Sequence, residues 1–257
     1  MRLLDAHAHL CDPAFDADLE EVLDRGRAAG VAAIVAVGET LADARKNLEL
    51  GARFPRVVLP AAGLYPVHLD AGQAEAIEAL IRERPRDFAA IGEVGLDHWK
   101  VPDGPGREAQ REIFLRFVAL SLELDLPLNV HSRSASRPAV ELLLERGARR
   151  VLLHAFDGKA STALPAVEAG YFFSIPPSIV RSEQKRKLAR RLPLSCLLLE
   201  TDSPVLGPAP GVRNEPANLP IALAALAEIK ELPAEAVAEA AAENALRLFV
   251  TRGTATR

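Results

Sequence analysis

The chain has 257 residues, 49% of them hydrophobic and 26% charged, so it can bury the core of one large barrel or of two smaller domains. Its 31 basic and 35 acidic residues give a net charge of -4, which excludes the global basic field of a general nucleic-acid binder. Any recognition of phosphate must therefore be local.

The first predicted strand ends in two histidines, within the sequence LLDAHAHL. His7 and His9 are two residues apart, and side chains at positions i and i+2 of a strand point to the same face. Both imidazoles therefore converge where the strand ends, which suggests a metal site. An isolated His-x-His motif is weak evidence, because one histidine can end the strand while the other lies at the surface.

Short β-branched or leucine-rich runs then alternate with longer amphipathic stretches along the whole chain. This alternation is typical of repeated βα units around a parallel sheet. The eight predicted strands lie near residues 3–7, 31–37, 57–63, 88–94, 127–131, 151–156, 171–175 and 196–202. The stretches between them end in Gly or are followed by Pro, as helix termini often are.

Eight strands and eight helices in this length predict an α/β fold, a TIM (β/α)8 barrel. No Pro-, Gly- or Ser-rich linker interrupts the series, so we expect a single domain over residues 1–250. The sequence PAEAVAEAAAENALRLF predicts an extra C-terminal helix that starts at Pro233, and residues 251–257 are expected to be a disordered tail. The alternative, an open doubly wound sheet, would need a Gly-rich loop after the first strand, and AHAHLCD contains no glycine.

All six histidines lie at the carboxyl end of a predicted strand or in the loop after it, where barrel enzymes build their sites. They are His7, His9, His68, His98, His131 and His154. Two acids occupy equivalent positions, Glu93 in AAIGEVGLD and Asp202 in LLLETDSP. Such groups are costly to bury without a partner, and divalent cations supply one. A nitrogen and oxygen ligand set suits zinc, manganese or iron, and a carboxylate between two ions can bridge them.

A metal pair of this kind predicts hydrolysis. Two ions about 3.5–4 Å apart lower the pKa of a shared water from 15.7 towards roughly 7, which produces a metal-activated hydroxide at neutral pH. Asp202 can accept the proton as hydroxide attacks, because a metal-linked carboxylate keeps one oxygen free. Cys11 is a further potential soft ligand, although a thiol beside a metal mouth is more often incidental.

The two cysteines, Cys11 and Cys196, are far apart and form no C-x-x-C pair, which fits a reducing compartment. The first apolar run is too short for a signal-peptide core, and no run approaches roughly 18 apolar residues. We therefore expect a cytoplasmic protein that does not contact a membrane.

A hydrolase of phosphodiesters also needs groups that hold phosphate, and Arg133 in HSRSA is the first candidate. It could instead pair with a neighbouring helix, and Lys159 and Arg213 are weaker candidates because solvated loop charges are common. His98 and Trp99 follow GLD, where the aromatic ring could stack on a base or cover the barrel rim. The basic run RSEQKRKLARR at 181–191 could steer DNA, but we favour a solvated outer helix face.

The motifs DAHAHL, IGEVGLD, NVHSR, LLHAFDG, ETDSP and RNEPANL occur in this order between His7 and about Phe249. Together they resemble the TatD family of metal-dependent deoxyribonucleases, within the amidohydrolase superfamily. The resemblance implies DNA as the substrate and two divalent ions, magnesium, manganese or zinc. The ligands it implies are His7, His9, Glu93, His131, His154 and Asp202. The first two histidines and Asp202 would hold one ion, and Glu93 would bridge it to a second ion on the other two histidines.

Two positions depart from the family pattern. The family often carries Gly-x-His-Pro after the third strand, whereas this chain reads GLYP, with Tyr65 in place of the histidine. A phenol does not replace imidazole as a neutral ligand, but it can hydrogen-bond a phosphate oxygen. We therefore predict that Tyr65 binds substrate, with His68 as a second contact unless it is a solvent-exposed loop residue. Cys11 takes the Asp position of His-x-His-Leu-Asp, followed by Asp12.

Three functions follow from these observations. We favour a metal-dependent nuclease, in which Asp202 and Glu93 are the catalytic carboxylates. The second is a hydrolase of a small ester, lactone, amide or phosphotriester, because barrels with similar metal pairs host many chemistries, and it predicts a narrow, apolar mouth. The third is a non-catalytic metal-binding barrel. We expect a monomer with no obligate protein partner.

Overall fold

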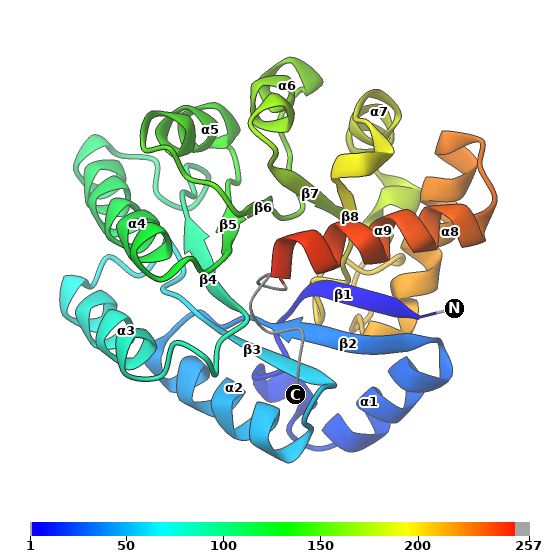
Figure 1. Cartoon of the computed structure of the whole chain (residues 1–257), viewed down its shortest axis with the longest axis horizontal. Helices are drawn as coiled ribbons and strands as arrows, with labels where there is room; N and C mark the ends of the chain where they lie inside the picture. Colours follow the sequence, from blue (N-terminus) through cyan, green and yellow to red (C-terminus); the bar gives the residue numbers. More distant parts are fainter. Residues whose placement is uncertain (1, 250–257) are drawn as a thin grey trace.

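The computed structural model of the protein describes residues 2–249 and shows a ring of strands surrounded by helices (Figure 1). The strands are β1 (Leu3–Ala8), β2 (Val31–Ala36), β3 (Val58–Ala62), β4 (Ala90–Gly95), β5 (Leu128–His131), β6 (Val151–Leu153), β7 (Phe172–Ile175) and β8 (Leu197–Leu199). Each strand pairs in parallel with the next, in the order β1 to β8. The prediction of a TIM barrel is confirmed, and a doubly wound sheet, whose strand order reverses at a switch point, is excluded.

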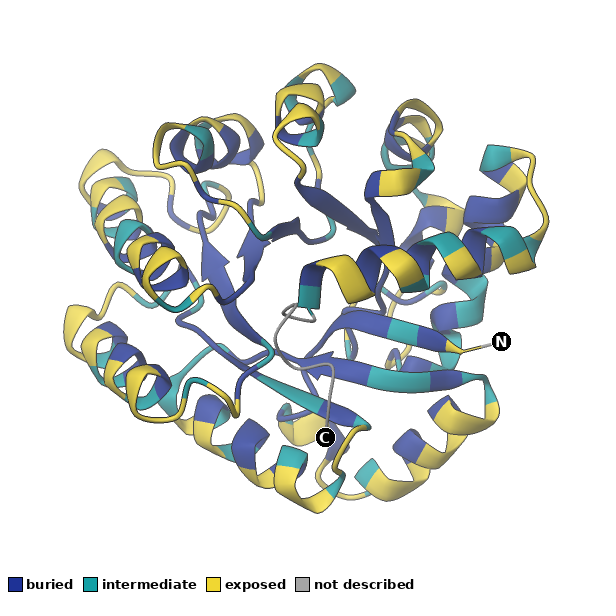
Figure 2. Ribbon diagram, in the orientation of Figure 1, coloured by how far each residue is buried: buried dark blue, intermediate teal, exposed yellow. Residues whose placement is uncertain are grey.

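The helices lie outside the strands and bury the faces that they turn toward them (Figure 2). They are α1 (Leu19–Ala28), α2 (Leu41–Arg53), α3 (Ala71–Glu83), α4 (Gly104–Leu124), α5 (Ser136–Glu145), α6 (Ala160–Glu168), α7 (Glu183–Arg191), α8 (Leu219–Lys230) and α9 (Ala234–Phe249). Short 3-10 helices are η1 (Pro13–Phe15), η2 (Pro177–Arg181), η3 (Leu194–Cys196) and η4 (Pro216–Asn218). Side-chain caps begin several helices, and Thr40 with Asp43 forms a full capping box at α2.

Alternate residues along the strands belong to different apolar clusters, of which the described residues form three. Val130, Leu153 and Leu199 belong to the large core between the strands and the helices. Leu152 and Leu198, each one position away, belong to a smaller cluster inside the barrel. The period of two therefore fills both faces of the sheet, as a closed barrel requires.

The predicted extra C-terminal helix is present as α9, which begins one residue after Pro233. It lies across one end of the barrel in Figure 1, where Ala245 and Leu248 pack against the inner residues Phe172 and Leu198. This helix covers the end of the barrel where the strands begin and leaves the carboxyl ends of the strands for a site. The tail predicted over residues 251–257 lies outside the described residues.

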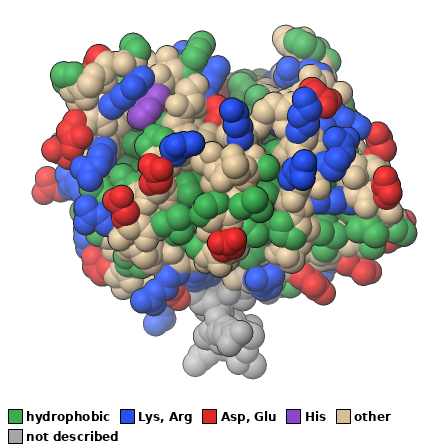
Figure 3. All heavy atoms as spheres, turned by 90° about the horizontal axis from the view of Figure 1, so that it is seen from above, with side chains coloured by type: hydrophobic (Ala, Val, Ile, Leu, Met, Phe, Trp, Pro, Cys, Tyr) green, Lys and Arg blue, Asp and Glu red, His purple; other side chains and the backbone are tan. Residues whose placement is uncertain are grey.

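Basic and acidic side chains are interspersed on the face seen in Figure 3, as the balanced composition predicts. Within residues 2–249, none of the helices is both long enough and apolar enough to cross a bilayer.

Candidate metal centre

The carboxyl ends of β1, β4 and β8 bring four of the predicted ligands together. The Nε2 atoms of His7 and His9 lie 3.2 Å apart. Asp202 Oδ1 lies 3.4 and 3.5 Å from these two nitrogens, and Glu93 Oε2 lies 3.8 and 3.3 Å from them. Ligands about 2.1 Å from a tetrahedral zinc ion are about 3.4 Å from one another. The four atoms therefore have the spacing of a metal-ligand set.

A second group of ligand atoms surrounds the other oxygen of Glu93. Its Oε1 atom lies 2.6 Å from His131 Nδ1 and 2.8 Å from His154 Nε2. The two histidine nitrogens lie 3.3 Å apart. Glu93 thus presents one oxygen to each group, which is the arrangement of a carboxylate that bridges two ions.

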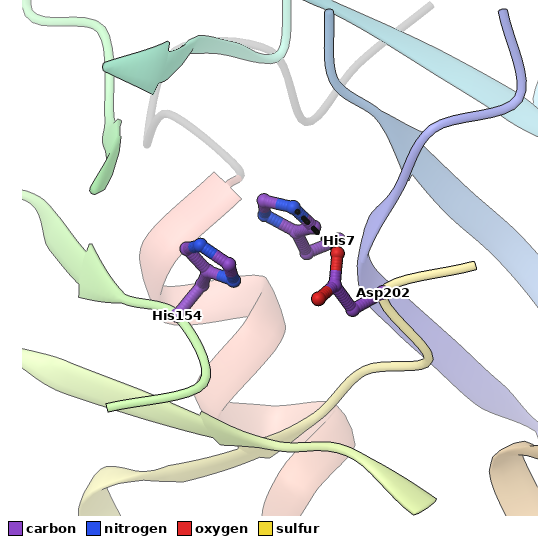
Figure 4. A group of neighbouring side chains, drawn as sticks. All are labelled: His7, His154 and Asp202. Carbon is purple, nitrogen blue, oxygen red and sulfur yellow. Dashed lines mark ion pairs between the residues drawn. The ribbon is translucent and has the colours of Figure 1, made fainter. Parts of the chain in front are cut away.

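The two groups adjoin one another through His7 and His154, whose rings stack at 3.8 Å with an interplanar angle of 9°. Figure 4 shows these two rings side by side, with the Asp202 carboxylate directed at His7. All six predicted ligands therefore gather at one place, and none of them is more than 9% exposed. The structure brings together residues from five strands or the loops that follow them.

The hydrogen bonds of Asn129 define which nitrogen of His7 carries a proton. Asn129 Nδ2 donates to the Ala6 carbonyl at 2.9 Å, so its Oδ1 atom accepts from His7 Nδ1, also at 2.9 Å. The Nε2 atom of His7 then carries a lone pair and faces the ligand cluster. This protonation state is the one that a metal ligand needs.

Two carboxylates outside the cluster lie beside His131 and His154. Asp97 Oδ2 lies 3.0 Å from His131 Nε2, and its Oδ1 accepts from the backbone N–H of Trp99. Glu200 Oε2 lies 3.7 Å from His154 Nδ1. A carboxylate at hydrogen-bond distance, as Asp97 is, fixes the ring orientation of a metal-binding histidine, whereas His154 Nδ1 has no hydrogen-bond partner among the described residues. Sequence reasoning missed both, although they stand within the motifs GLD and ETD.

Burial disfavours the charged form of every group in the cluster. At several groups, however, a neighbouring opposite charge has the larger effect on the pKa and keeps the group charged. Burial opposes ionisation of Glu93, but His154 and His131 hold the pKa of that carboxyl well below its usual range. Burial also opposes a proton on His9, but Asp202 and Glu93 raise its pKa well above the ordinary value. Buried His154, beside His7, has its pKa lowered to about 4. A cation bound among these groups would neutralise the carboxylates in place of the protons.

The backbone near the cluster is arranged to bring the ligands close. The β1 strand meets the segment after β8 through hydrogen bonds from Asp202 N to His7 O and from His9 N to Ser203 O, both 2.8 Å. Gly95 in IGEVGLD has a φ of 145°, and a Cβ added there would lie 2.0 Å from the His131 carbonyl oxygen. This glycine therefore lets β4 approach β5 closely enough for Glu93 to reach His131.

A cavity of about 430 Å³ opens above the cluster, and its lining tests the placement of the other predicted residues. Tyr65 and Arg133 both line it. The Tyr65 hydroxyl donates to Asp97 Oδ2 at 3.3 Å. His68 is absent from the described lining and instead lies 3.8 Å from the carboxylate of Glu39, which does line the cavity.

Other candidates from the sequence lie away from the ligand atoms. The Cys11 thiol is buried and donates to the Val37 carbonyl, and none of the ligand groups found among the described residues includes it. Arg213 pairs with Asp18, and Lys159 is exposed before α6.

The basic run 181–191 only partly forms the solvated face that we expected. Arg190 and Arg191 are exposed, but Lys185 turns inward and lines the cavity. Lys185 precedes the buried residues Leu188 and Ala189 by three and four positions, which places all three on one helix face. The helical spacing of Lys185 from Leu188 and Ala189 therefore indicated that its side chain faces inward, although the charge pattern of the run suggested a solvated face.

Comparison with known proteins agrees with the fold. Residues 4–250 match the family model described as TatD related DNase. The chain is 46% identical over 258 residues to human Deoxyribonuclease TATDN3, with 96% of this chain and 94% of the human protein covered. It is 35% identical over 257 residues to the Bacillus subtilis uncharacterized metal-dependent hydrolase YabD, with 96% and 98% covered.

A solved structure gives the same result. The crystal structure of YjjV, a TatD homologue from Escherichia coli K12, matches with a TM-score of 0.90 and 30% identity, and the match covers 97% of this chain and 98% of that one. The resemblance seen in the motifs is thereby confirmed: the chain belongs to the TatD-related DNase family.

Proposed function

We propose that the protein hydrolyses phosphodiester bonds of DNA with two divalent metal ions. The ligands would be His7, His9, Glu93, His131, His154 and Asp202. The observation that carries the proposal is the position of Glu93, whose two oxygens face two separate sets of ligand atoms. The names of two relatives, a deoxyribonuclease and a metal-dependent hydrolase, support it.

The donor set supports a metal with mixed nitrogen and oxygen ligands. Four imidazoles and two carboxylates suit zinc or manganese, and magnesium is a third candidate. Bound ions would supply Lewis-acid activation of water and of the phosphate. Glu93 would act by holding both ions at one place.

The remaining chemistry belongs to side chains at the cavity. Asp202 lines the cavity and directs Oδ1 at His7 and His9, so we assign it as the acceptor of the proton from the attacking water. Arg133 would hold a phosphate oxygen with its guanidinium group. Burial raises the pKa of Tyr65, so the phenol stays neutral. Its single proton is donated to Asp97 in this structure, so donation to the same phosphate would replace that hydrogen bond.

The cavity lining favours an anionic substrate over a neutral one. A small ester or lactone hydrolase would have a narrow, apolar mouth, whereas the cations Arg133 and Lys185 line this one together with the acids Glu39 and Asp157. Two divalent ions on the ligand groups would add the positive charge that an anionic substrate needs. A non-catalytic metal-binding barrel would also use Asp202 as a ligand, so the activity assay separates it from a hydrolase. A monomeric state and a cytoplasmic location stay predictions.

The first test strips the protein with a chelator and restores magnesium, manganese or zinc separately. Single-stranded DNA and a phosphodiester dye are then followed in parallel. We expect metal-dependent shortening of DNA that a His9→Ala variant lacks. Cleavage of the dye with intact DNA would retain the metal chemistry and refute the DNA substrate. If all phosphodiester and ester substrates stay intact, the non-catalytic alternative gains.

A further inference from the structure

Lys185 is a half-buried cation that lines the cavity from helix α7. Its Nζ atom donates to the Ala155 carbonyl at 2.9 Å, and Ala155 directly follows His154. In residues 2–249 no carboxylate lies within ion-pair distance of Lys185, whereas its neighbours Arg186 and Lys187 pair with acids. An ammonium group has three donors, so two remain for a ligand.

Ser132 supplies a second unsatisfied group in the same cavity. Ser132 is among the residues that line the cavity, and it is only 3% exposed. Its Oγ atom has no hydrogen-bond partner among the described residues. A buried hydroxyl without a partner costs free energy, and a rotation about χ1 would let Ser132 Oγ donate to a ligand oxygen in the cavity.

Arg133, the next residue, supplies a third group. Its guanidinium carbon lies 3.7 Å from the centre of the Trp99 ring, which holds the guanidinium plane by a cation-π contact. Within the described part of the chain its side chain has no carboxylate partner. The guanidinium N–H groups are therefore available to an anion.

The acids of the cavity wall do not occupy these donors. Asp157 also lines the cavity, but it accepts hydrogen bonds from Ser134 N and Ser136 Oγ. Burial lowers the pKa of Lys185, while the carboxylates of Glu200, Asp202 and Asp157 oppose the loss of its charge. The lysine is thus held near acids without a direct ion pair.

We propose that Lys185, Ser132 and Arg133 form an anion subsite that binds the phosphate group of the substrate beside His154. The subsite selects an anionic phosphate ester over a neutral ester. This inference rests on the proposed function and names the class of substrate that the metal centre takes. Lys185 and Ser132 are the residues that neither the motifs nor the metal geometry assign.

The test compares Lys185→Met with Lys187→Met, both in metal-loaded protein. The first substitution removes the inward charge and keeps an apolar stem, and the second removes an exposed charge from the same helix. Calorimetry measures the Kd of inorganic phosphate, and kinetics measure kcat and KM for bis(p-nitrophenyl) phosphate and for neutral p-nitrophenyl acetate. Metal content is measured in each sample.

For Lys185→Met we expect the phosphate Kd and the KM of the phosphodiester to rise roughly 10- to 100-fold, as the loss of a charge-assisted hydrogen bond predicts. Metal content and any turnover of the neutral ester should not change. Lys187→Met should behave as wild type, and Lys185→Arg should recover part of the phosphate affinity. Ser132→Ala should weaken phosphate binding by a smaller factor.

Wild-type phosphate affinity in Lys185→Met would overturn the subsite, even if the protein cleaves DNA. A loss of metal together with phosphate would also overturn it, because Lys185 would then act through the His154 group. If wild type cleaves no phosphodiester, the proposed function fails, and the calorimetric comparison still decides whether Lys185 binds phosphate.

Discussion

The two ends of the barrel place opposite kinds of buried side chain along the same strands. Near α9 the inward residues are apolar, and two positions further along the chain, at the mouth, they are polar or ionisable. The apolar residues are Leu152, Phe172 and Leu198, and those two positions further along are His154, Ser174 and Glu200. A spacing of two keeps both members of each pair inside the barrel.

Each of these strands therefore contributes to stability at its first residues and to the candidate site at its carboxyl end. Burial of apolar surface stabilises the fold by about 25 cal/mol per Å². Buried carboxylates and imidazoles cost stability unless a partner compensates them. Burial at the covered end therefore offsets the free-energy cost of the buried ionisable groups at the mouth. Substitutions at the covered end should change mainly stability, and substitutions at the mouth should change mainly metal binding and activity.

The largest effect is expected from Glu93→Gln, because Glu93 faces both ligand groups. We expect loss of bound metal and a fall in activity of more than about 100-fold, since even outer partners of ligands cost 10- to 100-fold. The free energy of unfolding of the metal-free protein should fall, because the lowered pKa of Glu93 means that the fold stabilises its charge through His154 and His131. Metal analysis, kinetics and urea unfolding check these outcomes.

The matched control for Glu93→Gln is Glu78→Gln. Glu78 is also buried, but it pairs with Arg82 and Arg116 on the helices outside the barrel. Its loss should destabilise the protein and leave metal content unchanged. Full metal content in Glu93→Gln would refute the bridging role.

Asp202→Asn should give the next largest effect. The amide cannot accept the proton, and general-base catalysis contributes about 10²- to 10⁴-fold, so kcat should fall within that range. The stability of the metal-free protein, measured as its Tm in thermal unfolding, should change much less. Turnover near the wild-type value would show that Asp202 is not the proton acceptor.

The sequence predicted the strands and the gathering of the six proposed ligands at one end of the barrel, because both depend on local patterns. Apolar runs mark the strands, and histidines or acids at their carboxyl ends must meet at one mouth once the barrel forms. Asn129 illustrates what such patterns omit. Its bonds to His7 and Ala6 join β5 to β1 across the barrel interior, and nothing local to PLNVH indicates that contact.

Tyr65 and His68 show a second kind of limit. The motif comparison identified Tyr65 as a departure from the family pattern, but only the structure shows its hydroxyl bound to Asp97, the partner of His131. His68 lies on the same loop, yet it turns to Glu39. Proximity in sequence therefore predicted the loop's location and not the direction of each side chain.

Leu198→Ala tests the covered end of the barrel. Leu198 is fully buried on the strand that leads to Asp202, and truncation of a buried leucine costs about 2–5 kcal/mol of unfolding free energy. We expect a lower Tm and unchanged kcat and metal content at temperatures where the variant is folded. A matching loss of activity in fully folded protein would show that the two ends are not independent.

Asn129→Ala should give the smallest effect, because it leaves every ligand in place and removes only the group that orients His7. Without the Asn129 oxygen, Nδ1–H of His7 loses its acceptor, and the ring no longer favours the tautomer with a free Nε2 lone pair. Metal affinity or activity should fall about 10- to 100-fold. Asn129→Asp retains an acceptor and should recover part of the loss. Equal loss in both variants would mean that Asn129 acts through packing inside the barrel and not through its hydrogen bond to His7. The residues that serve stability would then extend along β5 as far as the position next to the ligands.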